Sequence, residues 1–443
     1  MSRYWCELAW LGGERAESGV VVEVAAGRIG AVTTGAPVPP PGTERLDGMT
    51  VPGLANAHSH AFQRALRGRT HREGGSFWTW REQMYGVAER LDPDDYHVLA
   101  RATFAEMALA GIACVGEFHY LHHAPDGTPY DDPNEMGRRL IAAATEAGIR
   151  ITLLDACYLH GGIGEGPSGP QRRFSDGSAE AWAERVDALA EGDAVRIGAA
   201  IHSVRAVDPE GAALVAGWAG SSARPLHAHV SEQPAENCAS LEAYGRTPTG
   251  VLADAGALAA QFTAVHATHL DGADVSLLGG SEACCCVCPT TERDLADGIG
   301  GMRRLVDAGV SLSLGSDSHA SIDMFEEARA VELDERLASG ERGRHGAAEL
   351  LRAATEAGHV SLGWPDAGRI APGARADLVT IGLDSVRLAG TTSEEAIEAV
   401  VFAASAADVR DVIIDGREVV RGGSHVAVDV SRELHDAVVK ATA

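Results

Sequence analysis

The sequence predicts an α/β protein: a (β/α)8 barrel of the TIM type with a small β-sandwich domain built from both termini. Two observations lead to this fold class. Between residues 51 and 365, short apolar runs alternate eight times with Ala-rich stretches of helical spacing. Residues 1–50 and 366–443 instead carry the β-branched runs and turns of strands. We therefore expect residues 51–365 to form the barrel and the two ends to form one composite β domain.

Both ends of the chain have strand-like sequence. GVVVEVAAGRIGAV (19–32) alternates roughly around a glycine-containing turn, and the prolines of VPPPG (38–42) then interrupt any regular element. Near the other end, ADLVTIGLD (376–384) predicts a strand. VRDVIIDGREVVRGG (409–423) predicts two strands joined by an Asp-Gly turn. The simplest arrangement pairs these segments in one β domain.

The barrel strands are predicted from eight apolar runs. They cover residues 51–60, 111–118, 150–156, 195–202, 224–230, 262–269, 282–288 and 310–317. Continuous apolar runs suit strands that are buried on both faces. Segments between them, such as PNEMGRRLIAAATEAG (133–148), have helical spacing and end in glycine. Eight strand–helix repeats over about three hundred residues are the signature of a closed barrel.

Composition excludes several classes of protein. The 443 residues contain 37 Lys+Arg and 63 Asp+Glu, a formal net charge of −26, which argues against a nucleic-acid partner. There is one lysine, Lys440, so the body of the chain cannot supply a P-loop lysine or a Schiff base. We expect no signal peptide, because MSRYWCELAW lacks a basic stretch followed by an apolar core, and we find no run of eighteen apolar residues. We expect a cytoplasmic protein with reduced cysteines and no membrane partner.

Histidines fall at the carboxyl ends of the predicted strands, which is the catalytic face of such a barrel. His58 and His60 close the first strand, where residues i and i+2 point to one face about 6.6 Å apart. Two polar residues at a strand end would be the simpler interpretation of this pair alone. The case for a metal strengthens with HAHVSEQ (His227, His229, Glu232), VHATH (His266, His269) and GSDSH (Asp317, His319). Three histidines and a carboxylate give the open coordination of a catalytic metal site.

VPGLANAHSH, HAHVSEQ, VHATH and GSDSH, in this order, resemble the amidohydrolase superfamily of metal-dependent hydrolases, and the C-terminal ADLVTIGLDS and VIIDGREVV resemble its composite β domain. Many binuclear members use a carboxylated lysine on the fourth strand, but VRIGAAIH contains none, so a single divalent ion is expected. The resemblance implies the metal ligands His58, His60, His229 and Asp317. It implies that Glu232, His266 and Asp317 handle protons. His227 is then structural, and His269 is second choice to His266.

A closer resemblance is carried by HSHAFQRALRG, SFWTWREQMY, EFHYLHH, IHSVRAV and CPTTERDLADGI, which are similar to the formimidoylglutamate deiminase family of histidine degradation. It implies hydrolysis of N-formimino-L-glutamate to N-formyl-L-glutamate and ammonia. The implied substrate contacts are Gln63, Arg81, Tyr120, His202 and Arg205. Two arginines suit this partner, a small dicarboxylate, because each guanidinium can bind one carboxylate in a planar fork.

The implied mechanism uses Zn²⁺ as first choice, although iron and manganese also accept three nitrogens and one oxygen. Such an ion lowers the pKa of its water from ~15.7 toward ~7. Asp317 would take a proton from the water, His266 would orient the water, and Glu232 would hold the substrate nitrogen. A homodimer is expected because closed symmetric dimers are the commonest oligomers.

Several alternatives stay open. A deaminase of a heterocycle, such as guanine or an adenosine derivative, would use aromatic stacking in place of the arginine pair. A non-catalytic barrel would normally have lost its metal ligands, and this chain keeps them. We interpret CCCVC (284–288) as small buried residues. The pair His122–His123 is predicted on a loop surface, and GGIGEGPSGP (161–170) is predicted as a flap at the site.

Overall fold

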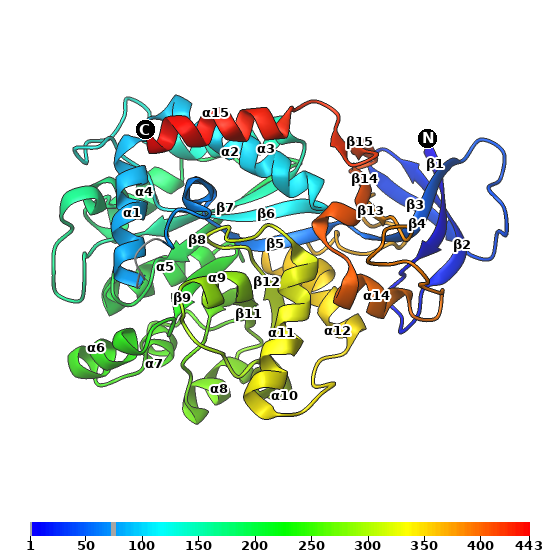
Figure 1. Ribbon diagram of the computed structural model, residues 1–443. Coiled ribbons are helices and arrows are strands. Elements are labelled where there is room, and N and C mark those ends of the chain that lie inside the picture. The colour runs from blue at the N-terminus through cyan, green and yellow to red at the C-terminus, as the bar shows by residue number, and fades with distance from the viewer. Residues whose placement is uncertain (1, 72–76) are drawn as a thin grey trace.

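The computed structural model describes residues 2–71 and 77–443 and has two sheets (Figure 1). One is a parallel sheet in the order β12-β11-β10-β9-β8-β7-β6-β5. Its strands are β5 (Leu54–Ser59), β6 (Ile112–His119), β7 (Arg150–Cys157), β8 (Val195–Ile201), β9 (Leu226–Val230), β10 (Phe262–His266), β11 (Cys284–Val287) and β12 (Ser311–Leu314). A parallel bridge between Ser59 and Asp317 joins its first and last members. All eight predicted strands are present, and the barrel is confirmed.

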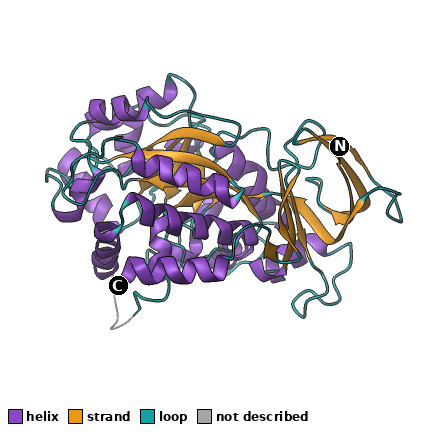
Figure 2. Cartoon of the chain, turned by 90° about the horizontal axis from the view of Figure 1, so that it is seen from above, coloured by secondary structure: helices purple, strands orange, loops and turns teal. Residues whose placement is uncertain are grey.

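Helices surround the barrel (Figure 2). The α-helices between strands are α1 (Phe77–Arg90), α2 (Pro93–Leu109), α3 (Glu135–Ala147), α4 (Ala179–Val186), α5 (Pro209–Gly220), α6 (Pro234–Tyr244), α7 (Pro248–Asp254), α8 (Gly272–Gly279), α9 (Pro289–Asp294) and α10 (Met302–Asp307). After β12 come α11 (Met324–Ser339), α12 (Ala347–Arg352), a π-turn (Ala353–Ala357) and α13 (Gly358–Ser361). Short 3-10 turns cover Ala61–Leu66, Gly169–Phe174 and Ala406–Asp408.

Local chemistry fixes where these helices begin and end. The Asp92 side chain accepts a hydrogen bond from the backbone N–H of Asp95, and Pro93 occupies the first position of α2. Gly148 ends α3 with a φ of 77°, a left-handed conformation that glycine adopts without strain. The glycine that the sequence predicts as a helix stop therefore has this role.

The second sheet contains both ends of the chain, as predicted. Its order is β16-β15-β14-β13-β4-β1-β2-β3. The strands are β1 (Ser2–Ala9), β2 (Glu17–Ala25), β3 (Arg28–Thr33), β4 (Glu44–Pro52), β13 (Leu378–Ile381), β14 (Val409–Ile414), β15 (Arg417–Arg421) and β16 (Ser424–His425). Antiparallel pairing of β4 with β13 joins the two ends. Asp415 and Gly416, both at positive φ, form the predicted turn between β14 and β15.

The last two α-helices of the chain pack against helices of the barrel. α14 (Ala396–Ala403) lies against α11 and α12, and α15 (Val430–Thr442) lies along α2, on the outside of the barrel (Figure 1). α15 buries Val430, Ala437 and Ala441 there. Within the part of the chain that the structure describes, no helix has the length and apolar character that crossing a membrane requires.

A buried ion pair joins the two sheets. Arg150, the first residue of β7, contacts both carboxylate oxygens of Asp377, just before β13, and the distance from Nη1 to Oδ1 is 3.0 Å. Each side chain is 1% exposed. Arg150 also lies 3.3 Å from Asp415 in the Asp-Gly turn. The guanidinium therefore connects the amino-terminal end of the barrel to the C-terminal strands.

Candidate metal centre and active site

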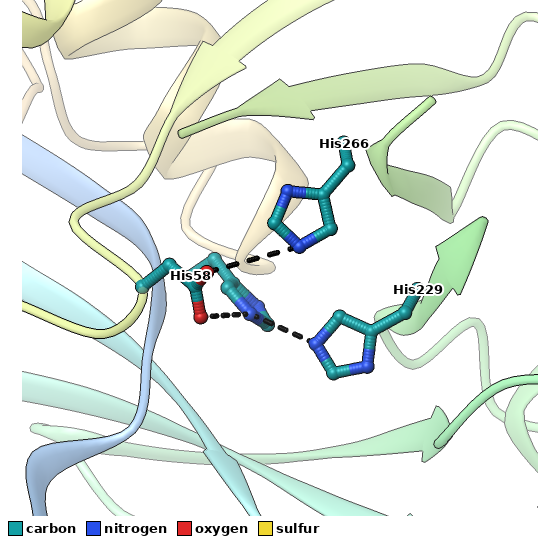
Figure 3. A group of neighbouring side chains, drawn as sticks. His58, His229 and His266 are labelled. Carbon is teal, nitrogen blue, oxygen red and sulfur yellow. Dashed lines mark hydrogen bonds and ion pairs between the residues drawn. The ribbon is translucent and has the colours of Figure 1, made fainter. Parts of the chain in front are cut away.

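Four histidines and one aspartate from four barrel strands converge at the carboxyl end of the barrel. Nε2 of His58 lies 3.3 Å from Oδ1 of Asp317 and 3.2 Å from Nε2 of His229. Nε2 of His60 is also 3.3 Å from Oδ1 of Asp317, and Nε2 of His266 is 3.8 Å from Oδ2. Figure 3 shows the rings of His58, His229 and His266 pointing toward one another. All five side chains are buried.

The donor set fits a divalent cation. One ligand atom from each of His58, His229, His266 and Asp317 lies within 4.8 Å of the other three. Nδ1 of His60 donates to the carbonyl of Phe118 (2.9 Å), and Nδ1 of His229 donates to that of His202 (2.8 Å). These bonds leave Nε2 of His60 and His229 unprotonated and directed at Asp317 and His58. An imidazole held in this way is prepared to ligate a metal.

His60 and His266 approach the same carboxylate from different strands, and their surroundings differ. Burial disfavours a charge on His266, yet the carboxylates of Glu232, Glu292 and Asp317 raise its pKa well above the usual value. Burial lowers the pKa of His58 to about 3 and lowers the pKa of His60. His58 and His60 are thus neutral donors, while His266 lies among acids that favour a proton on its ring.

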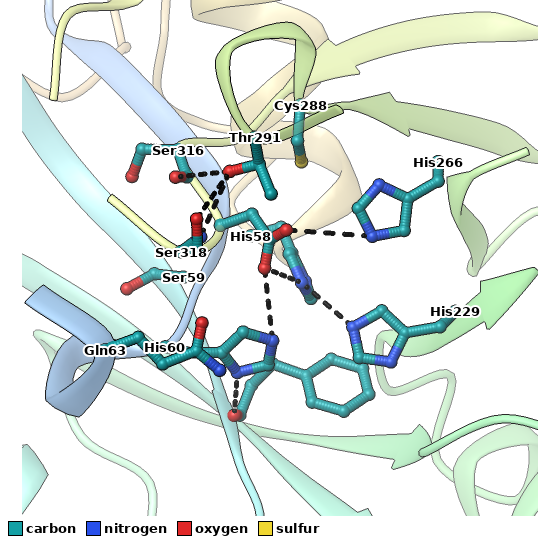
Figure 4. Close-up of polar contacts among 12 residues, drawn as sticks. His58, Ser59, His60, Gln63, His229, His266, Cys288, Thr291, Ser316 and Ser318 are labelled. Atoms are coloured by element: carbon teal, nitrogen blue, oxygen red, sulfur yellow. Dashed lines mark hydrogen bonds and ion pairs between the residues drawn. The ribbon is translucent and has the colours of Figure 1, made fainter. Parts of the chain in front are cut away.

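The loop after β12 presents Asp317 in an unusual backbone conformation, with a φ of 40°. Its N–H donates to the carbonyl of His58 (3.0 Å), and its own carbonyl accepts from the N–H of His60 (3.1 Å). On either side, Ser316 and Ser318 contact the hydroxyl of Thr291 at 3.3 and 3.1 Å (Figure 4). These bonds hold a conformation that residues other than glycine rarely adopt.

The buried carboxylate of Glu117 holds the chain on either side of His60. Oε2 of Glu117 accepts from the Ser59 hydroxyl (2.6 Å), and Oε1 accepts from the backbone N–H of Ala61 (2.7 Å). Burial raises the pKa of Glu117 to about 8. Glu117 occurs within EFHYLHH, but its position does not distinguish it from other polar residues at a strand end. The importance of Glu117 is therefore visible only in the folded protein.

A cavity of about 410 Å³ opens onto this cluster. Residues predicted to contact the substrate or to handle protons line it, namely Gln63, Arg81, Tyr120, His202, Arg205, Glu232, His266 and Asp317. The other predicted ligands His60 and His229 line it as well, while His58 lies behind them, 0% exposed. Gly161, Gly162, Ile163 and Glu165 show that the Gly-rich loop reaches the cavity.

Aromatic rings and two arginines surround the part of the cavity that carries the predicted substrate contacts. Nε2 of Gln63 donates to the hydroxyl of Tyr120 (2.8 Å). The His202 ring is edge-on to Tyr158, with centroids 4.7 Å apart. Nη2 of Arg205 lies 3.6 Å from Oε2 of Glu232. The Arg81 guanidinium lies 5.6 Å from the centroid of the Tyr85 ring.

Three predicted histidines lie away from the centre. Nε2 of His227 donates to the carbonyl of Ser361 (3.1 Å). Nε2 of His269 donates to the carbonyl of Asp297 (2.7 Å), and His319 contacts the hydroxyls of Ser59 and Ser316. All three rings have partners in the protein that fix them.

The prediction for His122 and His123 was wrong. Both are buried, 1% and 3% exposed, because their backbone N–H groups donate to the carbonyl of Arg173. His123 also lies 3.1 Å from Asp176. By contrast, Cys284, Cys285, Cys286 and Cys288 are buried free thiols, as predicted.

Residues that were not among the predicted contacts also line the cavity. Trp80, Met84 and Tyr85 lie within SFWTWREQMY, and the others are Tyr158, Phe174 and Glu236. The carboxylate of Glu236 accepts the backbone N–H of Glu232 (3.2 Å), and burial raises its pKa to about 7. Glu236 lies in the first turn of α6, which begins two residues after Glu232.

Comparison with known proteins agrees with this geometry. The amidohydrolase family profile matches residues 49–419. The chain is 40% identical over 406 residues to the formimidoylglutamate deiminase of Pseudomonas aeruginosa, which covers 88% of each protein. It is 28% identical over 375 residues to the 5-methylthioadenosine/S-adenosylhomocysteine deaminase of Natronomonas pharaonis, covering 84% of this chain and 81% of that one. A solved amidohydrolase structure from Brucella melitensis has a TM-score of 0.91 at 32% identity and covers 100% of both chains. With its barrel, its histidine–aspartate cluster and these relatives, the chain belongs to the amidohydrolase family of hydrolases.

Proposed function

We propose that the protein hydrolyses N-formimino-L-glutamate to N-formyl-L-glutamate and ammonia, a step of histidine degradation. The observation that carries this proposal is one cavity that holds both the histidine–aspartate cluster and two arginines, Arg81 and Arg205. The substrate has one amidine-like cation and two carboxylates, and the cavity offers groups of opposite charge for each. The 40% identity to a formimidoylglutamate deiminase supports the same substrate.

We infer that a single ion, Zn²⁺ as first choice, is held by His58, His60, His229 and Asp317. Neutral imidazoles and one carboxylate are ligands that zinc prefers, and strand β8 (VRIGAAI) has no lysine for a bridged second ion. When bound, the ion would activate water for attack at neutral pH. His266, the alternative third imidazole, is left to carry protons because three carboxylates face it.

In the proposed reaction, water adds to the formimino carbon and the bond to the terminal nitrogen breaks. Asp317 accepts a proton from the water. Glu232, whose Oε1 lies 3.8 Å from Nε2 of His266, holds the cationic formimino nitrogen as a carboxylate and then relays to it the proton that Asp317 took from the water, so that this nitrogen leaves as ammonia. His266 orients the water and stabilises negative charge on the adding oxygen. The N-formyl group keeps the water oxygen.

In this proposal, cavity residues that do not ligate the metal bind the glutamate part of the substrate. Arg81 and Arg205 each bind a carboxylate through a planar guanidinium. Tyr120 accepts a hydrogen bond from Gln63 (2.8 Å), and its own hydroxyl donates to the sulfur of Met84 (3.8 Å), a weak bond that it can exchange for one to a substrate oxygen. Oε1 of Gln63 is buried with no hydrogen-bond partner within residues 2–71 and 77–443, so it can accept a substrate N–H.

A second candidate is deamination of a heterocycle. Its support is the 28% identity to a nucleoside deaminase and the aromatic walls of the cavity, Trp80, Tyr85 and Tyr158. Purified enzyme should be assayed for ammonia release from N-formimino-L-glutamate, guanine and adenosine, with metal content measured in parallel. We expect turnover of the first substrate alone and about one zinc per chain. Release of ammonia from adenosine or guanine alone would reverse the assignment.

We also propose a homodimer working in the cytoplasm. Sedimentation equilibrium of the purified protein tests the dimer, and a monomer at micromolar concentration would contradict it.

A further inference from the structure

Gln171 lies behind the cavity wall, where three wall elements meet. It belongs to the 3-10 turn Gly169–Phe174 and is 5% exposed. Its Nε2 lies 3.2 Å from the hydroxyl of Tyr85, 3.1 Å from the hydroxyl of Tyr158 and 3.1 Å from the carbonyl of Gly161. Each of these three residues lines the cavity, whereas Gln171 does not. One amide thus joins helix α1, the end of strand β7 and the Gly-rich loop.

The orientation of this amide is fixed from its other end. Oε1 of Gln171 accepts from the backbone N–H of Ser168 (3.1 Å) and contacts its hydroxyl at 3.2 Å. A Cβ atom at Gly161 would lie only 2.7 Å from the same oxygen, so the loop approaches this closely because residue 161 is glycine. A turned amide would place its oxygen against the carbonyl of Gly161 and its nitrogen against the N–H of Ser168, so these two backbone groups fix its orientation.

The two tyrosines connect Gln171 to the predicted substrate contacts. The Tyr85 ring supports the Arg81 guanidinium at 5.6 Å, one helical turn away on α1. The Tyr158 ring packs edge-on against His202 at 4.7 Å, and His202 is 5.2 Å from His229 in the metal centre. A chain of contacts therefore runs from the metal centre to Arg81. Gln171 joins its two halves by hydrogen bonds, beside the Phe174 ring, which packs against both tyrosines.

Both arginines line the same cavity as Tyr85 and Tyr158. Burial raises the pKa of the Tyr158 hydroxyl, and the positive charges of Arg205 and Arg81 both oppose that shift. The same two charges act on His202, whose pKa burial lowers well below the usual value. The carboxylate-binding end of the cavity is therefore built around Tyr158, which Gln171 holds.

We propose that Gln171 is a positioning residue that sets the separation of Arg81 from Arg205 and so selects a dicarboxylate substrate. It acts through Tyr85 and Tyr158 and touches neither the substrate nor the metal ligands. The inference rests on the proposed function, because it concerns how the two carboxylates are bound.

The test replaces Gln171 with methionine, which keeps the length of the side chain and removes its hydrogen bonds. We expect KM for N-formimino-L-glutamate to rise about tenfold, the effect of a hydrogen bond worth roughly 1.4 kcal/mol, with kcat within about twofold and zinc content unchanged. Gln83→Met, at an exposed position on α1, is the matched control. An unchanged KM would overturn the proposal, and so would a loss of kcat and zinc with KM constant.

A second variant keeps the proposal testable if Gln171→Met does not fold. Tyr85→Phe removes one hydroxyl and keeps the ring beneath Arg81, so KM should rise several-fold. Adding Gln171→Met to Tyr85→Phe should then raise KM by less than the product of the single effects. Fully multiplicative effects would show that the two residues act independently and would contradict the proposal. A wild-type enzyme without turnover of this substrate would instead contradict the proposed function.

Discussion

The buried histidines of this protein differ in the partners that their ring nitrogens have. Nε2 of His122 donates to the carbonyl of Ala156 (3.0 Å), so its Nδ1 can accept from Nε2 of His119 at 3.3 Å. The nearby carboxylate of Asp155 is already bound by Arg185 and Trp182. His119, His122 and Asp155 are close enough to hold an ion. Nδ1 of His119 has no hydrogen-bond partner among the described residues, but the other ring nitrogens and the acid are paired within the protein, and no cavity opens onto them as one does onto the cluster around Asp317 in the described residues.

Glu232 is the residue whose charge the proposed chemistry needs most. Glu232→Gln keeps the shape of the side chain but cannot carry the cationic nitrogen or pass on a proton. We expect kcat to fall by about 10²–10⁴ with zinc content and unfolding midpoint retained, measured by ammonia release and elemental analysis. Glu242→Gln, exposed on α6, is the control. Turnover within a factor of two of wild type would refute the role of Glu232.

His359 predicts a pH dependence of stability. Its Nδ1 donates to the carbonyl of Thr355 (2.9 Å), and its Nε2 accepts from Arg150 (3.4 Å). Burial and the charge of Arg150 lower its pKa from 6.5 to about 4. Between these values the unfolded chain binds a proton that the folded chain does not, so stability falls as the pH decreases through this range.

His359→Gln should remove this contribution, up to roughly 3 kcal/mol at pH 4, so the unfolding free energy should vary less between pH 6.5 and 4. Urea unfolding at several pH values measures it, with His435→Gln, exposed on α15, as the control. An unaltered pH dependence would contradict a neutral buried His359.

At the scale of elements, strained backbone conformations are concentrated at the carboxyl ends of the barrel strands. Residues after or at the ends of β9, β10 and β12 adopt positive φ without being glycine: Ser231, His266, Ala267, Asp317 and His319. Such conformations cost of order 1–3 kcal/mol each and persist because surrounding bonds hold them. The strands thus turn sharply where their side chains enter the centre.

Gly315, the residue after β12, allows two of these strands to meet. A Cβ atom there would lie 2.7 Å from Cβ of His58 and 2.9 Å from Sγ of Cys288. Gly315→Ala should therefore displace His58, lower zinc content severalfold and destabilise the fold by about 1–3 kcal/mol. Metal analysis and thermal unfolding test this. Gly346→Ala, where a Cβ would meet no atom of the described chain within 4 Å, should change neither.

The elements that could be predicted from sequence are those with repeated local signals. The barrel strands were evident because each apolar run recurs with a helix after it. The histidines and the aspartate of the cluster were evident because they end or directly follow these runs. Gln171 and Glu117 could not be found in this way, since their importance comes from contacts with segments such as Tyr85 and Ser59 that are distant in the chain. The burial of His122 and His123 depends likewise on Arg173 from a loop fifty residues later.

For the molecule as a whole, the junction between the two sheets depends on charge. The ring of Trp364 lies 4.2 Å from the Arg196 guanidinium and 4.8 Å from that of Arg375, next to the Arg150–Asp377 pair. A buried charge that loses its partner is strongly destabilising, more so than the loss of an exposed pair.

Asp377→Ala leaves Arg150 buried without its main carboxylate. We expect a loss of about 3–5 kcal/mol in the free energy of unfolding, measured in urea. The control is Asp384→Ala, which removes the exposed partner of Arg410 and should leave the midpoint unchanged. Equal effects of the two substitutions would show that the junction does not depend on this ion pair.

Gly53 alone separates β4 of the terminal sheet from β5 of the barrel, and its N–H donates to the carbonyl of Asp377. The strand that carries His58 is therefore a direct continuation of a strand in the middle of the other sheet. The two parts cannot be treated as interchangeable modules: a gene truncated at residue 50 would encode a barrel whose first ligand strand has lost its anchor. We expect such a fragment to be unable to retain zinc.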